Sequence, residues 1–287
     1  MSDIELREWV SGAQTTRDLH FRQAIHTIVT AMTLDAELAE MSYMKGGILL
    51  AIRYHSPRYT TDIDFSTPTG YSQEEQEKLL GRLSKGLALA SERLEYDIEC
   101  RIQSAKPEPR PKPEFRVLWI NLKVGIGYAL RGTKDHIKLM SGQCTTAIQM
   151  DYSFDERVPT NDIFELDSDQ CLRVYALTTL VAEKYRALLQ QVIRRRARRQ
   201  DIYDLNFLLR SFNLTSRECR TEILSALRIK AEDREVEISR DAMASQEVRE
   251  RAAQEYEHLA DELSEGELPD FDESFDNVRA YFESLPW

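Results

Sequence analysis

Two aspartates, Asp62 and Asp64, stand two residues apart in the run R-Y-T-T-D-I-D-F. If that run is a β-strand, its side chains alternate between the two faces and both carboxylates lie on the same one. Two like charges at that separation repel each other unless a cation lies between them. Mg²⁺ prefers oxygen ligands and commonly joins one or two carboxylates to substrate phosphates. The pair therefore predicts a magnesium site, although an isolated D-x-D is more often a solvated strand edge.

A glycine pair precedes these aspartates by about fifteen residues, in Lys45-Gly46-Gly47. Glycines let backbone N–H groups approach a phosphate closely, and the N-terminus of a helix that begins there favours anions. A glycine pair alone usually marks only a tight turn. A phosphate-binding turn followed on the next strand by a D-x-D is a much more specific combination, and it predicts a nucleotide bound with its metal.

A lysine lies within an apolar helical stripe further along the chain. From about residue 170 to residue 193 the sequence has helical periodicity, and Lys184 projects onto the same face as Leu180, Val181 and Leu188. An unpaired buried ammonium is unfavourable, so Lys184 must either extend to solvent or contact an anion. In the following segment, Q-D-I-Y-D-L, Asp201 lies within the apolar stripe and Asp204 at its edge, although Asp201 could instead cap the helix.

The segment from Lys45 to Ser66, K-G-G-I-L-L-A-I-R-Y-H-S-P-R-Y-T-T-D-I-D-F-S, resembles the first motif of the AbiEii/AbiGii toxin family in the polymerase-β-like nucleotidyltransferase superfamily. The later segments A-E-K-Y-R-A-L and R-x-x-D-I-Y-D-L resemble further motifs of that family, in the same order. The resemblance implies a nucleoside triphosphate as substrate, with a role for each matching residue. Gly46, Gly47, Arg58 and Lys184 would bind the nucleotide, Asp62 and Asp64 would hold Mg²⁺, and Asp201 and Asp204 would orient Lys184 or complete the catalytic site.

The resemblance also implies a biological setting, a toxin of a toxin–antitoxin or phage-defence system with a cognate antitoxin as protein partner. Related MenT-type toxins use the 3′ end of tRNA as acceptor. Here a tRNA or other RNA acceptor is a hypothesis based on the arginine run at residues 194–199 and the basic connection at 106–116, with Arg199 or a neighbour facing the RNA. A protein or a small molecule as acceptor remains an alternative.

One position departs from the family pattern. Its second motif is K-x-D, and the corresponding run here is Lys123-Val124-Gly125, with glycine where the third carboxylate is expected. Asp97 or Glu99 could replace that acid, or catalysis could use the first two carboxylates together with Asp204. The remaining alternative is a catalytically impaired module that binds nucleotide and acts by contacting a partner.

The surrounding elements predict an α+β fold in the N-terminal half followed by an all-helical C-terminal half. The family resemblance implies that the first half is a polymerase-β-like core, a small mixed sheet flanked by helices. We expect helices at 15–40 and 72–90, and a strand, a turn, a short helix and a second strand within residues 44–66. Strands near 94–102 and 115–128 should form a hairpin, followed by strands near 144–152 and 162–166 and only helices thereafter. The corresponding domains are residues 1–168, the nucleotidyltransferase domain, and 169–287, a helical domain with an acidic tail.

Composition narrows the class of protein. With 287 residues and 42% hydrophobic side chains, the chain can bury a full core. The four cysteines lie far apart, which predicts neither a disulfide framework nor a zinc site, and the absence of a long apolar segment predicts no membrane association and a cytoplasmic location. Residues 232–287 contain 18 acidic and 5 basic side chains, which leaves 31 acidic and 33 basic side chains in residues 1–231. The net charge of −11 therefore does not exclude an RNA-binding surface on the body of the protein.

Overall fold

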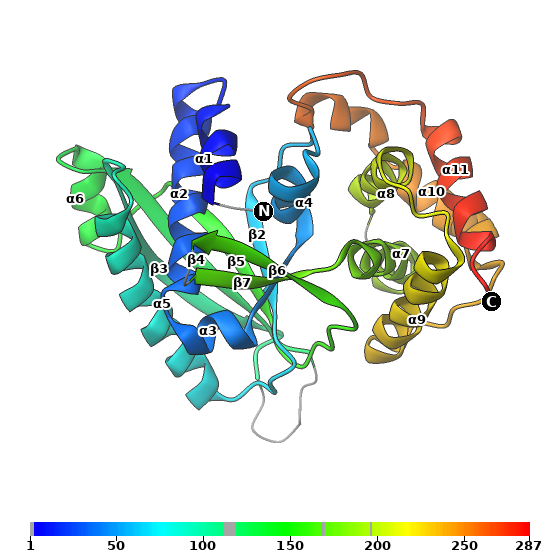
Figure 1. The fold of residues 1–287 in the computed structure, drawn as a ribbon, viewed down its shortest axis with the longest axis horizontal. Coiled ribbons are helices and arrows are strands. Elements are labelled where there is room, and N and C mark those ends of the chain that lie inside the picture. The colour runs from blue at the N-terminus through cyan, green and yellow to red at the C-terminus, as the bar shows by residue number, and fades with distance from the viewer. Residues whose placement is uncertain (1–2, 112–118, 168–169, 196) are drawn as a thin grey trace. The chain divides into compact units, whose positions relative to one another are not determined.

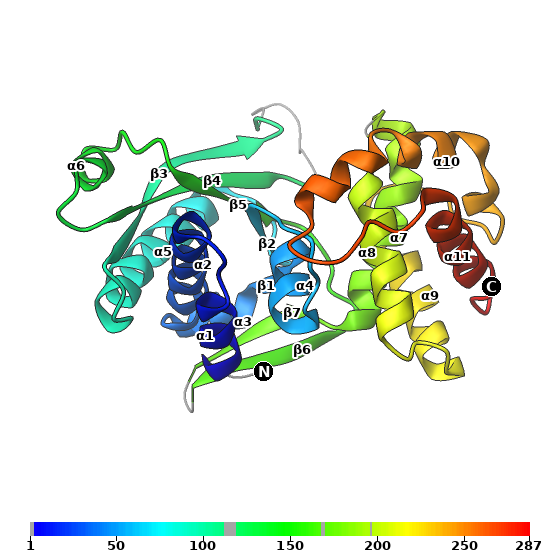
Figure 2. The ribbon, with the colours of Figure 1, turned by 90° about the horizontal axis from the view of Figure 1, so that it is seen from above.

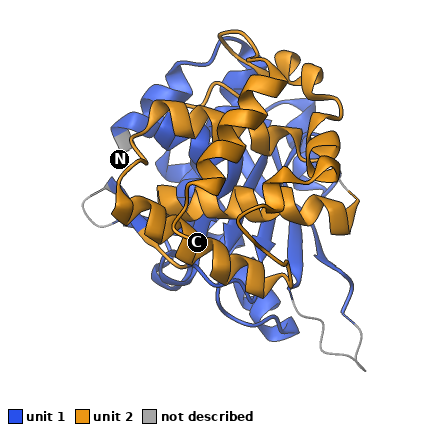
Figure 3. Ribbon diagram, turned by 90° about the vertical axis from the view of Figure 1, so that its right-hand side faces the viewer, with its two compact units in different colours: residues 1–54, 61–158, 162–174 blue, residues 55–60, 159–161, 175–287 orange. Residues whose placement is uncertain are grey.

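The computed structural model describes residues 3–111, 119–167, 170–195 and 197–287 (Figure 1). The chain divides into two compact units, coloured separately in Figure 3. The first, the sheet unit, comprises residues 1–54, 61–158 and 162–174, and the second, the helical unit, comprises residues 55–60, 159–161 and 175–287. The last segment of the sheet unit therefore ends at Val174. The expected domain boundary between residues 168 and 169 stays a prediction.

The described part of the sheet unit contains a seven-stranded sheet in the order β3-β4-β5-β2-β1-β7-β6. Strand β2 pairs in parallel with β5, and β1 pairs in parallel with β7, whereas β1–β2, β3–β4 and β4–β5 are antiparallel. The strands are β1 (Tyr43–Lys45), β2 (Asp62–Ser66), β3 (Ile98–Glu108), β4 (Asn121–Leu130), β5 (Ala147–Ser153), β6 (Asn161–Asp167) and β7 (Gln170–Tyr175). The sheet is mixed, as the sequence predicts.

Alternation along β4 shows why these strands form a layer. Leu122, Val124 and Ile126 are fully buried on one face of the strand, while Lys123 and Gly125 lie on the other. This alternation is expected of a strand that packs one face against the core, because successive side chains point to opposite faces of the sheet. The opposite face of β4, and of its neighbours β5 and β2, carries the polar residues of interest.

Helices complete the sheet unit (Figure 2), and α2 and α5 pack against each other and against β3. The helices are α1 (Asp3–Ser11), α2 (Thr16–Thr33), α3 (Ala36–Met41), α4 (Gly46–Tyr54), α5 (Gln73–Arg93) and α6 (Lys134–Met140). A single helix at 15–40 was wrong, because the side chain of Asp35 accepts hydrogen bonds from the backbone of residues 37 and 38 and starts α3 as a separate helix.

The helical unit is built around α7, which contacts α8, α9 and α10, while α11 packs on α8. Its elements are α7 (Leu177–Arg194), α8 (Arg199–Ser211), α9 (Arg217–Asp233), η1 (Ala242–Ala244), α10 (Gln246–Ala253), η2 (Tyr256–Glu262) and α11 (Phe271–Glu283). None of the helices in the described residues has the length and apolar character needed to cross a lipid bilayer.

The α+β class with a helical C-terminal half is confirmed. The prediction of helix from residue 170 onward was wrong for its first residues, which form strand β7 beside β1 because C-L-R-V-Y alternates buried and exposed positions. The strand expected from Leu94 begins at Ile98. Residues 112–118, which include the end of the basic connection and the start of the strand expected at 115–128, lie outside the described residues, as does Arg196 of the arginine run.

Candidate functional site

The turn between β1 and α4 brings Gly46 against Asp64. Lys45 pairs with Asp64 across β1 and β2, and Gly46 follows with a positive φ of 79°. A Cβ atom on Gly46 would lie 1.9 Å from Asp64 Oδ2, 2.7 Å from its Cγ and 3.0 Å from its Cβ. Rotating the Asp64 side chain cannot relieve the contact with its own Cβ, so the carboxylate requires glycine at position 46.

We expect Gly46→Ala to destabilise the protein by about 1–3 kcal/mol, because alanine is both overpacked and strained at a positive φ. Thermal or urea unfolding measures the loss. Gly81→Ala is the matched control, since Gly81 lies within α5 and a Cβ there meets nothing within 4 Å. Alanine is the better helix former, so the control should be neutral or slightly stabilising. Equal stability of Gly46→Ala and the wild type would contradict the steric argument.

The two predicted metal ligands occupy one face of β2. Asp62 and Asp64 are the first and third residues of the strand, with the fully buried Ile63 between them pointing to the other face. Asp62 is exposed and accepts a hydrogen bond from Thr61 Oγ1 at 3.2 Å, whereas Asp64 is half-buried. The sheet thus presents two carboxylates side by side, at the end of the strand where β1 turns into α4.

A third carboxylate, Asp151 on β5, lies in parallel register with Asp64. Burial raises the pKa of Asp151, and the negative charge of Asp62 raises it further, against a hydrogen bond from Asn121 and the charge of Lys123. Its Oδ1 atom is buried and has no hydrogen-bond partner in the described part of the chain. A buried carboxylate oxygen without a hydrogen-bond partner, on a strand next to the one that carries two more carboxylates, is one that a cation would stabilise.

The glycine at position 125 therefore does not leave the sheet without a third acid. Gly125 pairs with Gln149, two residue pairs along β4 and β5 from the Lys123–Asp151 pair, and a Cβ on it would lie 2.6 Å from Ser104 Oγ. Of the expected replacements, Glu99 pairs with Ala129, about 20 Å along β4 from the partner of Asp151. Its carboxylate contacts Arg101 at 2.6 Å and His136 at 2.9 Å. Asp97, one residue before β3, lies at the same end of that strand.

Sequence reasoning missed Asp151, although a signal was present. The run A-I-Q-M-D-Y-S alternates strictly, with Ile148, Met150 and Tyr152 buried. An aspartate in such a strand is as much a candidate metal ligand or base as the two aspartates of the D-x-D. What the sequence could not supply is the register that sets Asp151 beside Asp64 rather than one pair above or below.

These carboxylates fit a Mg²⁺ ion that is completed by substrate. Within the described residues, no group of three or more His, Cys, Asp or Glu side chains is close enough together to hold a metal alone. Mg²⁺ normally binds through one or two carboxylates plus substrate phosphates and water. Asp62 and Asp64 could provide the carboxylates. Asp151 lies on the adjacent strand, and its Oδ1 atom has no hydrogen-bond partner among the described residues.

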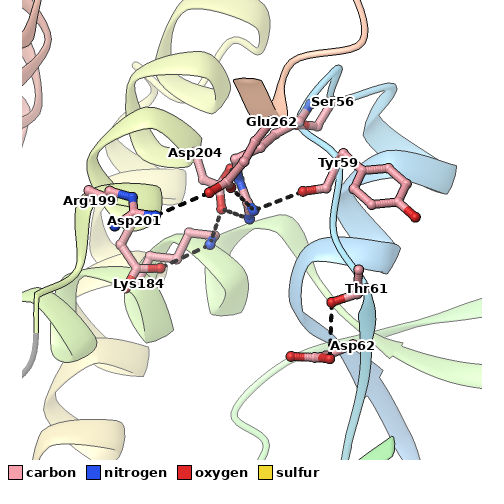
Figure 4. Close-up of polar contacts among 10 residues, drawn as sticks. Ser56, Tyr59, Thr61, Asp62, Lys184, Arg199, Asp201, Asp204 and Glu262 are labelled. Atoms are coloured by element: carbon pink, nitrogen blue, oxygen red, sulfur yellow. Dashed lines mark hydrogen bonds and ion pairs between the residues drawn. The ribbon is translucent and has the colours of Figure 1, made fainter. Parts of the chain in front are cut away.

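A second cluster lies within the helical unit, around Lys184 (Figure 4). Lys184 Nζ contacts Asp204 Oδ2 at 2.6 Å and Asp201 Oδ1 at 3.1 Å. The lysine in the apolar stripe of α7 therefore reaches two anions on α8 rather than solvent. The alternative that Asp201 caps α8 was wrong, since the N-cap is Arg198 and Asp201 belongs to the first helical turn.

Arg58 belongs to the same cluster. Its Nε and Nη2 atoms donate to Asp204 Oδ1 and Oδ2 at 2.9 and 2.8 Å, a bidentate pair in which the Asp204 side chain is 0% exposed. Burial by itself would raise the pKa of Asp204, but the charges of Arg58 and Lys184 outweigh it and lower that pKa to about 2. Burial likewise disfavours the Lys184 ammonium, but Asp204 and Asp201 hold the pKa of Lys184 above its usual value. Asp204 and Lys184 are thus both ionised at neutral pH.

The arginine run has two different environments. Arg194 and Arg195 are exposed at the C-terminus of α7, with Arg195 in the left-handed region at φ 52°. Arg199 instead contacts Glu255 at 2.6 Å and Glu262 at 3.3 Å. Arg199 is therefore paired with glutamates of the C-terminal region, and among the described arginines of the run Arg194 and Arg195 are exposed.

Comparison with known proteins gives one family match. The sequence profile described as "Nucleotidyl transferase AbiEii toxin, Type IV TA system" matches residues 28–279. Among solved structures, JHP933 from Helicobacter pylori is similar with a TM-score of 0.49 and 14% identity, over 94% of this chain and 92% of that one. MenT4, a nucleotidyltransferase toxin from Mycobacterium tuberculosis, is similar with a TM-score of 0.46 and 13% identity, over 99% of both chains. No curated protein sequence matches.

Proposed function

The chain belongs to the AbiEii family of nucleotidyl transferase toxins from type IV toxin–antitoxin systems, and on that premise we propose that it transfers a nucleotide from a nucleoside triphosphate to an acceptor, with Mg²⁺ as cofactor. Nucleotide transfer depends mainly on positioning and on neutralising phosphate charge. The residues described above offer carboxylates for the metal, a glycine turn for phosphate and a permanently charged lysine.

One observation carries this proposal: Asp64 and Asp151 lie in register on adjacent parallel strands, and a buried oxygen of Asp151 has no hydrogen-bond partner among the described residues. Bound Mg²⁺ would supply charge neutralisation at the phosphates and lower the pKa of the attacking hydroxyl. Asp62 and Asp64 would hold the ion. Asp151, whose pKa is raised by burial and by Asp62, would accept the proton of that hydroxyl.

The phosphates of the nucleotide are assigned to the glycine turn and the lysine cluster. Gly46 and Gly47 begin α4, where backbone N–H groups lack helical partners and favour anions. Lys184 would neutralise the triphosphate, with Asp201 and Asp204 orienting its ammonium. Arg58 would contribute through Nη1, because its other two nitrogens hold Asp204.

We assign an RNA acceptor, with the 3′ end of tRNA as first candidate, because the exposed pair Arg194–Arg195 offers a local basic surface despite the acidic total charge. The family description also places this chain in toxin–antitoxin systems. A cognate antitoxin, and a role in phage defence in the cytoplasm, belong to the same proposal. The motivation for a non-catalytic binding module is the glycine at position 125, and our proposal instead assigns the role of the third acid to Asp151.

The test is incubation of the purified protein with each of the four α-labelled nucleoside triphosphates, Mg²⁺ and total tRNA. We expect label to be incorporated into RNA, with pyrophosphate released. Treating the product with ribonuclease and with protease identifies the acceptor, since a labelled protein would survive ribonuclease. Asp64→Ala should incorporate no label. Absence of label on any acceptor, or equal labelling by the Asp64→Ala variant, would exclude the proposed activity.

A further inference from the structure

A segment of the acidic C-terminal region is hydrogen-bonded through its backbone to the loop that carries Arg58. We call residues 255–264 the strap. The backbone N–H of Tyr59 donates to the carbonyl of Glu262 at 2.6 Å, and Ser264 donates to the carbonyl of Pro57 at 2.9 Å. Arg58 and Leu263 form an antiparallel β-bridge. All of these residues belong to the helical unit, so the strap is held in register against residues 57–59.

This register places two strap carboxylates on the arginines of the lysine cluster. Glu262 lies 3.3 Å from Arg199 Nη2 (Figure 4) and 3.6 Å from Arg58 Nη1. Glu255 lies 2.6 Å from Arg199 Nη1. Glu262 therefore bridges two guanidinium groups that come from segments 141 residues apart. A bridging carboxylate has the same charge sign and the same acceptor atoms as a phosphate group between two arginines.

The two carboxylates that Arg58 contacts differ in how tightly they are bound. Asp204 is 0% exposed and makes a bidentate contact at 2.8–2.9 Å, whereas Glu262 is 28% exposed and makes a single contact at 3.6 Å. Glu255 is more exposed still, at 64%. Exposed ion pairs contribute little to stability, while a buried bidentate pair is difficult to break. Asp204 is thus a permanent partner of Arg58, and the strap glutamates are exchangeable ones.

The charge balance of the cluster points to an anionic ligand. Four cations, Arg58, Lys184, Arg198 and Arg199, face four anions, Asp201, Asp204, Glu255 and Glu262. Without the two strap glutamates, the partly buried cluster would have two more positive than negative charges. The Nε atom of Arg199 is also buried without a hydrogen-bond partner in the described residues, so this guanidinium has donor capacity that its glutamates do not use.

From these contacts we propose that Arg58 and Arg199 form a binding site for a phosphate group, and that the strap fills this site through Glu262 and Glu255 until a substrate phosphate displaces it. The proposal rests on the nucleotidyltransferase function, because both the nucleoside triphosphate and an RNA acceptor carry such groups. Arg58 can offer its Nη1 and Arg199 its guanidinium group, and two guanidinium groups that converge on one carboxylate can converge on one phosphate. The strap glutamates thereby compete with a substrate phosphate for Arg58 and Arg199.

The experiment measures binding, without turnover, by the full chain and two double variants. Glu255→Gln/Glu262→Gln removes the strap charges while keeping side-chain size. Glu257→Gln/Glu265→Gln removes two charges from exposed residues within the strap and directly after it, whose side chains make no hydrogen bond or ion pair in the described part of the chain. The probes are inorganic triphosphate, followed by calorimetry, and a purified tRNA, followed by fluorescence anisotropy at fixed salt concentration.

We expect the Glu255→Gln/Glu262→Gln variant to bind at least one probe about tenfold more tightly, the effect of one charge-assisted contact. The affinity of the control variant for either probe should change by less than about twofold, since its substitutions alter only the long-range electrostatic potential of the protein. A gain with triphosphate alone identifies the nucleotide as ligand, and a gain with tRNA alone identifies the acceptor. Adding Arg199→Gln to the strap variant should abolish the gain.

Unchanged affinity for both probes, or equal gains in the strap and control variants, would overturn the proposal. A gain that persists after Arg199→Gln would do the same. Because no step of this experiment requires catalysis, a protein that binds as expected but transfers no label would contradict only the proposed activity.

Discussion

Asp151→Asn is expected to lower the rate of nucleotide transfer by about 10²–10⁴-fold, the range that a positioned general base contributes. Asparagine keeps the shape of the side chain and its place on β5 but can neither accept the proton of the acceptor hydroxyl nor share a cation with Asp64. The measurement is the initial rate of label incorporation at saturating Mg²⁺. Asp135→Asn makes the same chemical change on an exposed residue of α6 and should leave the rate unchanged.

The pH profile distinguishes a base from a residue that only supports the fold. Burial, reinforced by Asp62, raises the pKa of Asp151 above that of an ordinary aspartate. A base must be deprotonated, so wild-type activity should fall as the pH drops through this raised pKa. The residual activity of Asp151→Asn should lack that acidic decline. A variant with wild-type rate, or one with low activity and an unchanged acidic decline, would contradict the assignment of Asp151 as base.

Asp204→Ala is expected to destabilise the protein by about 3–5 kcal/mol, because it leaves two buried cations without their shared anion. Asp204 is 0% exposed and contacts both Arg58 and Lys184. Urea unfolding measures the loss. Asp201→Ala is the matched comparison and should have a smaller effect, since Lys184 and Arg58 both keep Asp204. Equal losses in the two variants would contradict the central place of Asp204 in this cluster.

Acid should reproduce the effect of Asp204→Ala reversibly. The pKa of Asp204 is about 2 in the folded protein, below the ordinary value of 3.8. A carboxyl with a lowered pKa stabilises the folded state fully above its unfolded pKa, and this contribution is lost as the pH falls from about 3.8 toward 2. The stability of the wild type should therefore decrease over that window more steeply than that of Asp204→Ala. Parallel curves would indicate that other carboxylates dominate the acid response.

Local patterns carried much of the fold prediction. The strand, helix and strand between residues 43 and 66 are confirmed because each element is short and bounded by glycine or proline. The hairpin β3–β4 and the long α7 are confirmed by their periodicity. The two main errors have a common cause, the competition between local and long-range interactions. A capping aspartate divided the expected helix at 15–40, and pairing with β1 made a strand of residues 170–175.

The site was predicted less completely than the fold. Gly46 was expected to make room for a phosphate, and the structure adds that the carboxylate of Asp64 already requires the absence of a Cβ there. The sequence left two outcomes open for Lys184, extension to solvent or contact with an anion, and in the structure its ammonium contacts Asp204 and Asp201. Arg58 was expected to bind nucleotide, and its bidentate contact with Asp204, 146 residues away, could not be anticipated from its motif. The roles of all of these residues in catalysis stay predictions.

The sequence by itself determined the chemistry that the chain can offer: two carboxylates on one strand face, glycines before a helix, and a lysine in an apolar stripe, each set by spacing over a few residues. Only the tertiary structure decided which groups stand together. Sheet register brought Asp151 beside Asp64, and the strap brought Glu262 to Arg58 and Arg199. The reason is that register and ion pairing between distant segments depend on the free energy of the whole packed unit, which no local pattern of residues encodes.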